Sequence, residues 1–170
     1  MRSVFVATAL LSLFGAPASL LAGAWVISEI NISGGDLAAP VQITDQAVIR
    51  KFSPFAGPGS GVQTAAGYTP YSKPGGFVVD WSRGTTAAPG NVVTYYVQFR
   101  SLSPEHSYRL RYTVDRSSGE TFAYLPGKGE QEYKENVSMV LHGIEGNWFH
   151  AWLEWDKVAK PLIADAPKVH

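Results

Sequence analysis

The stretch "VVTYYVQFRSLSPEHSYRLRYTVD" (residues 92–115) decides the fold. Its apolar and aromatic side chains recur at every second position, on one face: Val93, Tyr95, Val97, Phe99, Tyr108, Leu110, Tyr112 and Val114. The positions between them are mostly polar: Thr94, Gln98, Arg100, Arg109, Arg111 and Thr113. A period of two predicts half-buried antiparallel strands with one face in water. We therefore expect strands at 92–101 and 107–115, joined by the turn "SLSPEH".

Shorter strand candidates lie on both sides of this pair, each bounded by turn-forming Gly, Pro or Ser. They are "WVISEINI" (25–32), "PVQI" (40–43), "GFVVDW" (76–81), "TFAYL" (121–125) and "NVSMVLH" (136–142). Between the second and third, "TDQAVIRKF" (44–52) predicts a short helix. Asp45 or Thr44 can accept a hydrogen bond from a backbone N–H of its first turn.

The stretch "NWFHAWLEW" (147–155) allows two interpretations. At about 100° per residue, Trp148, Trp152 and Trp155 fall on one helical face, which Ala159 and Leu162 extend. Asn147 would then cap the helix, residues 147–150 could still be extended, and Pro161 would end or kink it. The alternative is an exposed aromatic platform for a sugar. We favour the buried helix because it explains more residues.

Together these patterns predict an α+β fold. We expect a mainly antiparallel β-sheet or sandwich-like domain, with a short N-terminal helix and a C-terminal amphipathic helix packed on it.

The chain of 170 residues predicts one globular domain, residues 25–170, after a leader. Residues 1–24 have a basic start, an apolar core and the small residues "AGA" (22–24), which is typical of a secretory signal peptide. An uncleaved membrane anchor is the competing interpretation. The chain has no cysteine, so a domain exported by this leader must be held together by its apolar core. We expect a secreted or periplasmic bacterial protein.

The charge balance and the absence of known motifs argue against several classes of function. Fourteen basic residues balance fourteen acidic ones, so we expect no nucleic-acid partner and no membrane contact beyond the export signal. The four histidines lack metal-binding spacing, and "GPGSG" (57–61) lacks the Lys and Ser/Thr of a phosphate loop. We therefore expect neither metal nor cofactor.

Two sets of candidate site residues remain. Asp80, inside an apolar stretch, could act in acid–base catalysis with Glu130, Glu132 or a histidine. Alternation could instead turn Asp80 toward solvent. Candidate ligand-binding residues are Tyr68 and Tyr71 in the long Gly/Pro-rich loop 53–76, and Tyr124 and Lys128 in "YLPGKGEQEY" (124–133).

The strings "GGDL", "ITD" and "GPG", followed by "GFVVDW", "YLPGKGE" and "GNWFHAW", resemble a family of uncharacterised secreted bacterial proteins. The resemblance runs from about Ile30 to Leu162. It implies bacterial export and a single domain, and it carries over no activity or site residue.

The sequence thus predicts a secreted or envelope-facing, non-enzymatic binding or structural domain with an unknown protein or glycan partner. One alternative is a small hydrolase that uses Asp80. Another is a carbohydrate- or peptidoglycan-binding module that uses the loop tyrosines.

Overall fold

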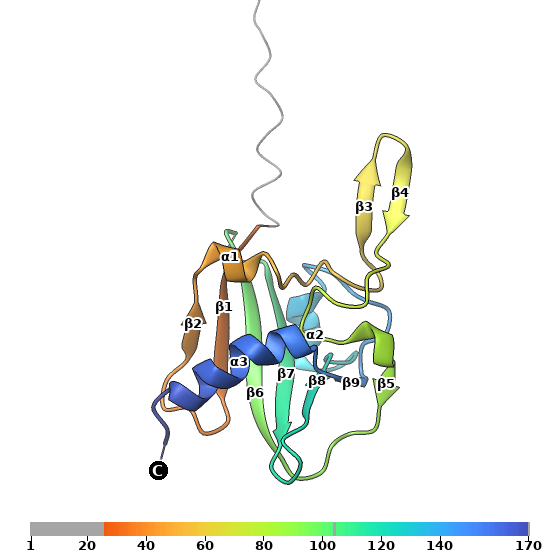
Figure 1. Cartoon of the computed structure of the whole chain (residues 1–170). Coiled ribbons are helices and arrows are strands. Elements are labelled where there is room, and N and C mark those ends of the chain that lie inside the picture. Colours follow the sequence, from red (N-terminus) through yellow and green to blue (C-terminus); the bar gives the residue numbers. More distant parts are fainter. Residues whose placement is uncertain (1–25, 104, 170) are drawn as a thin grey trace, which may run out of the picture.

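The computed structural model describes residues 26–103 and 105–169; the predicted leader and its anchor alternative lie outside the described residues. The described residues form a seven-stranded antiparallel sheet in the order β2-β1-β6-β7-β8-β9-β5 (Figure 1). Its strands are β1 (Ile27–Gly34), β2 (Val41–Ile43), β5 (Thr85–Thr86), β6 (Val92–Ser101), β7 (Ser107–Asp115), β8 (Thr121–Tyr124) and β9 (Trp148–His150). The helices are α1 (Gln46–Ile49), α2 (Gln131–Asn136), α3 (Leu153–Asp165) and the 3₁₀ turn η1 (Trp81–Arg83). The α+β prediction is confirmed, with a single main sheet.

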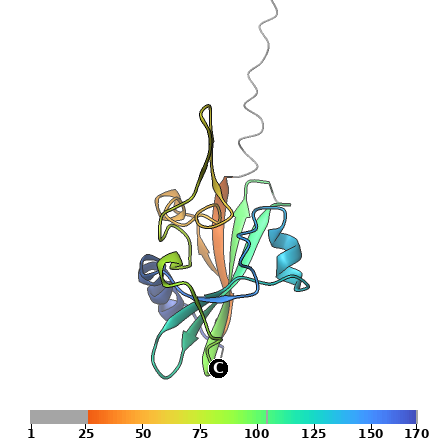
Figure 2. The same cartoon turned by 90° about the vertical axis from the view of Figure 1, so that its right-hand side faces the viewer.

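The central pair β6 and β7 forms as predicted. Tyr95 pairs with Tyr112, Val97 with Leu110 and Phe99 with Tyr108, and all six side chains are buried. The prediction that the other face is in water is wrong over β7. There Thr113 is fully buried, and α2 packs against the strand, on the side of the sheet opposite to α3 (Figure 2).

Helix α1 begins where the sequence predicts. The carboxylate of Asp45 accepts a hydrogen bond from the Ala47 amide at 2.7 Å. The helix is shorter than the predicted 44–52, but Ile49 and Phe52 still face the core.

The prediction that three tryptophans share one helical face is wrong. Trp148 lies in β9, Trp152 precedes the first residue of α3, and only Trp155 is inside the helix, where it is fully buried. The chain stays extended through His150 because β9 pairs with β8, so the helix starts late and Asn147 does not cap it. The buried face therefore includes Ile163, while Leu162 is 37% exposed. The exposed Pro161 lies inside the helix without ending it.

Two predicted strands are also wrong. Phe77, Val78 and Val79 are all buried in succession, and only Val79 makes a bridge, to Ala151. Burial on both sides explains why these residues do not alternate. Residues 136–142 start at the last residue of α2 and continue as turn and loop.

The long loop 53–76 contains a hairpin that the sequence analysis missed. Its strands are β3 (Gly61–Thr64) and β4 (Gly67–Pro70), and it projects from the body of the protein (Figure 1).

The core lies between the sheet and α3. Trp155 is at its centre and makes edge contacts with Phe52, at 5.1 Å between ring centroids, and with Tyr112, at 6.2 Å. Phe77 adds contacts to Phe99 and Tyr108. This aromatic layer fixes α3, and with it Trp152, against the segments that carry the hairpin.

Candidate ligand-binding pocket

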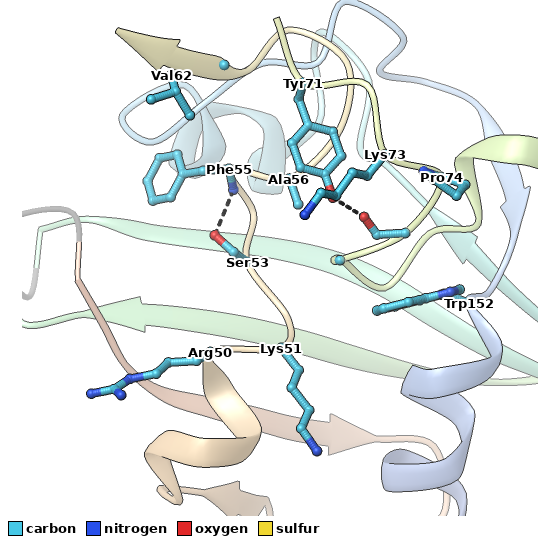
Figure 3. Close-up of a pocket in the computed structure, with 13 residues that line it drawn as sticks. Arg50, Lys51, Ser53, Phe55, Ala56, Val62, Tyr71, Lys73, Pro74 and Trp152 are labelled. Atoms are coloured by element: carbon cyan, nitrogen blue, oxygen red, sulfur yellow. Dashed lines mark hydrogen bonds between the residues drawn. The ribbon is translucent and has the colours of Figure 1, made fainter. Parts of the chain in front are cut away.

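A pocket of about 650 Å³ opens where the hairpin joins the body of the protein. One wall comes from residues 50–56 after α1, a second from residues 71–76 after β4, and the others from Gly61 and Val62 of β3 and from Trp152 (Figure 3). Pockets of several hundred Å³ with mainly apolar walls are typical small-molecule sites.

Backbone hydrogen bonds hold the walls together without a ligand. The Ser53 amide donates to the Gly76 carbonyl at 2.9 Å, and the Tyr71 amide donates to the Ser60 carbonyl at 2.9 Å. The Trp152 amide donates to the Val78 carbonyl at 2.7 Å, which ties α3 to the second wall. The pocket is therefore preformed, and a ligand need not order these segments on binding.

Three aromatic rings line the pocket: Phe55, Tyr71 and Trp152. The Trp152 ring lies directly against Gly75, where an added Cβ would come within 2.3 Å of it, so only glycine allows this contact. The Tyr71 hydroxyl donates a hydrogen bond to the Gly75 carbonyl, and burial raises the pKa of this phenol, which therefore stays neutral. The Phe55 ring lies near Val62 on the opposite side (Figure 3).

The charges around the pocket are of one sign. Arg50, Lys51 and Lys73 line it, and among the described residues that line it none is acidic. All three side chains belong to exposed residues, and none forms an ion pair with a carboxylate of the described chain. Lys73 extends into the pocket beside Tyr71, whereas Arg50 and Lys51 lie at its lower border (Figure 3).

Of the predicted binding residues, only Tyr71 lines this pocket. Tyr68 is 55% exposed on the hairpin, with its ring over Gly61. Tyr124 lies on the other side of the sheet, where its ring contacts Trp148 at 4.9 Å and its hydroxyl donates to Glu130. Lys128 is exposed in the loop before α2. The three tyrosines therefore do not form a common platform.

The predicted acid–base residues are also placed apart. Asp80 caps η1, where its carboxylate accepts hydrogen bonds from the Ser82 amide and hydroxyl. Glu130 and Glu132 instead bind the Arg111 guanidinium, at 2.9 and 3.3 Å.

Asp80 borders a second, smaller depression together with His150 and Asp156. The Asp80 amide donates a backbone hydrogen bond to the His150 carbonyl at 3.0 Å, but no hydrogen bond joins the two side chains in the described chain, and the His150 ring contacts Phe122. The Asp156 carboxylate accepts hydrogen bonds from Tyr112 and Thr121.

Trp152 was not predicted as a pocket residue, because the helical pattern places its side chain in the core. The cations of the pocket were not predicted either. "RKF" (50–52) and "SKP" (72–74) lie near the two ends of the long loop, and this signal could have found them.

The fold and the site define an α+β protein with a preformed apolar pocket bordered by cations. Comparisons with protein-family models, curated proteins and solved structures gave no match. Within the described residues, no helix is long and apolar enough to cross a membrane, and no group of three His, Cys, Asp or Glu side chains could hold a metal ion.

A buried histidine fixes the loop from which the hairpin rises. The His142 Nδ1–H donates to the Pro58 carbonyl, and the ring is 3% exposed among Phe77, Trp81 and Tyr108. Burial lowers the pKa of His142, although the Pro58 hydrogen bond and Glu145 oppose this effect.

We expect His142 to make stability depend on pH. The unfolded chain takes up this proton at the usual pKa of 6.5, whereas the folded chain takes it up only at lower pH. The free energy of unfolding should therefore fall as the pH falls through 6.5 toward the folded-state pKa. Urea unfolding at a series of pH values measures this. A His142→Asn variant, whose amide can still donate to Pro58, should show a shallower dependence, and an unchanged one would contradict the assignment.

Proposed function

We propose that this protein is an exported, non-enzymatic binding domain that holds a small ligand with an apolar body in the pocket between residues 50–56, residues 71–76 and Trp152. The observation that carries the proposal is the preformed aromatic cavity itself. Its size suits one small molecule, and its walls offer flat surfaces against which an apolar body can pack.

Export is supported by the sequence of residues 1–24, with its basic start, apolar core and small residues before Trp25. N-terminal sequencing of the protein recovered outside the cytoplasm tests this part, and a mature chain that begins at Trp25 is the expected result.

Binding is supported by how the polar groups of the pocket are already used. The Tyr71 hydroxyl is bonded to Gly75, and the Ser53 hydroxyl accepts a hydrogen bond from the Phe55 amide at 3.2 Å. Both groups already make a hydrogen bond within the walls, so an apolar surface can pack against the walls without breaking one. The hydrolase hypothesis has weaker support. Asp80 shares a smaller depression with His150 and Asp156, but its carboxylate caps η1 and the Asp156 carboxylate is bonded to Tyr112 and Thr121.

We expect the protein to bind pyrenebutanol, a neutral probe with a flat apolar body, saturably and with one site per chain. Fluorescence anisotropy of the pyrene measures the dissociation constant. Because Trp152 forms one wall, Trp152→Ala should weaken binding about tenfold or more, which is a loss of about 1.4 kcal/mol.

The matched control is Trp148→Ala. Trp148 is also half-buried and lies only four positions away, but it packs on Tyr124 outside the pocket. This variant should bind the probe as the parent protein does, with circular dichroism confirming that both variants fold. Equal binding by the parent protein and both variants would place the probe elsewhere and overturn the proposal.

A further inference from the structure

We infer that the ligand of this pocket is an organic anion, whose apolar body packs against Phe55, Tyr71 and Trp152 and whose acidic group pairs with Lys73, in the positive field to which Arg50 and Lys51 contribute. The inference rests on the proposed function and adds the chemical class of the ligand. Its evidence is the distribution of charge in the described chain, which is independent of the shape of the pocket.

The cations around the pocket share one location and have no carboxylate partner. Ion pairs with carboxylates hold six cations elsewhere in the described chain: Arg100, Arg109, Arg111, Lys157, Lys160 and Lys168. Arg83, Arg116, Lys128 and Lys134 also have no such partner but do not line this pocket, whereas Arg50, Lys51 and Lys73 line it together and no acidic residue of the described chain lines it with them. A bound anion would complete this arrangement of charge.

The position of Lys73 makes it the direct partner of the acidic group. Its side chain is exposed and extends into the pocket beside the Tyr71 ring, whereas those of Arg50 and Lys51 lie at the lower border, directed away from Tyr71, and contribute only to the local field (Figure 3).

The neighbouring polar groups do not oppose an anion. Because Tyr71 remains neutral and its proton is donated to Gly75, the phenol adds no negative charge. The carboxylate nearest in sequence to Arg50 is that of Asp45, which is bonded to the Ala47 amide at the other end of α1.

Three probes that share one apolar body test the inference: pyrenebutanoate, pyrenebutanol and pyrenemethylamine. We expect pyrenebutanoate to bind about tenfold more tightly than pyrenebutanol, and the amine to bind most weakly, because the exposed ion pair with Lys73 contributes modestly and the two border cations add to its field. Raising the salt from about 0.02 to about 0.5 M should remove most of this preference, because the border charges are exposed to solvent.

Matched charge variants locate the effect. The triple variant Arg50→Gln/Lys51→Gln/Lys73→Gln should lose the preference for the acid while its affinity for pyrenebutanol is unchanged. The control Arg116→Gln/Lys128→Gln/Lys134→Gln removes three exposed cations that do not line the pocket, and so changes the net charge equally. It should keep the preference.

The possible results separate the two proposals. If no probe binds, the proposed function fails. If the acid and the alcohol bind equally to the parent protein, or if the two triple variants behave alike, the pocket still binds ligands but the anion inference is overturned. Co-sedimentation with vesicles of anionic lipid tests whether the cations bind a membrane surface instead of a soluble anion. Binding to vesicles that depends on Arg50, Lys51 and Lys73 would assign these cations to a membrane surface and also overturn the inference.

Discussion

Trp155→Ala should lower the free energy of unfolding by about 3–5 kcal/mol, a large part of the roughly 5–15 kcal/mol that stabilises a typical domain. Trp155 is fully buried at the centre of the layer between α3 and the sheet, where its ring contacts Phe52, Phe99 and Tyr112. Truncation removes this apolar contact and leaves a cavity that the neighbours on these three segments cannot close. Urea unfolding followed by circular dichroism measures the loss.

Two variants show whether burial is the cause. Leu153→Ala removes a side chain of the same helix that is 63% exposed, and it should change stability by less than about 0.5 kcal/mol. Trp155→Phe keeps much of the ring, and the indole N–H that it removes has no hydrogen-bond partner in the described chain, so it should cost much less than alanine. If Leu153→Ala and Trp155→Ala cost the same, α3 does not pack as described.

Asn136→Ala should destabilise the protein by about 2–4 kcal/mol, because it leaves two buried backbone groups without partners. The fully buried Asn136 amide accepts a hydrogen bond from the Arg109 N–H at 2.6 Å and donates one to the Arg109 carbonyl at 2.7 Å. Strand β8 ends at Tyr124, opposite Arg111, so β7 extends beyond its neighbour at Arg109. The Asn136 side chain takes the place of the missing strand and attaches α2 to the sheet.

The chemistry of the amide, more than its volume, should decide this effect. Asn136→Asp keeps the size but cannot donate to the Arg109 carbonyl, and should be at least as destabilising as alanine at neutral pH. Lys134→Ala changes an exposed residue of the same helix and is the control. Hydrogen exchange at the Arg109 amide gives a local measurement. Protection that stays unchanged in Asn136→Ala would contradict this role of the side chain.

Prediction from sequence succeeded where one local period governs a segment. Strands β6 and β7 have one buried face along most of their length, and the alternation of apolar and polar residues in their sequence predicts that face. Helix α1 was predicted because Asp45 is a local signal that acts within two residues of itself.

Prediction failed where contacts distant in sequence set the environment. Phe77, Val78 and Val79 have the composition of a strand, but both sides of this segment are covered by the core, so it makes only one bridge. The helix that contains Trp155 was predicted to start too early, because the pairing of β9 with β8 keeps the chain extended through His150.

The sequence by itself determined the α+β class, the central strand pair and a core that must hold without disulfides. These follow from composition and from periods of a few residues. Only the tertiary structure decided where the pocket lies. Trp152 and the cations Arg50, Lys51 and Lys73 come from three segments that span about one hundred positions, and their alignment depends on how α3 and the loop after α1 pack on the same sheet. No local pattern encodes that packing, because it is set by contacts between side chains far apart in the chain.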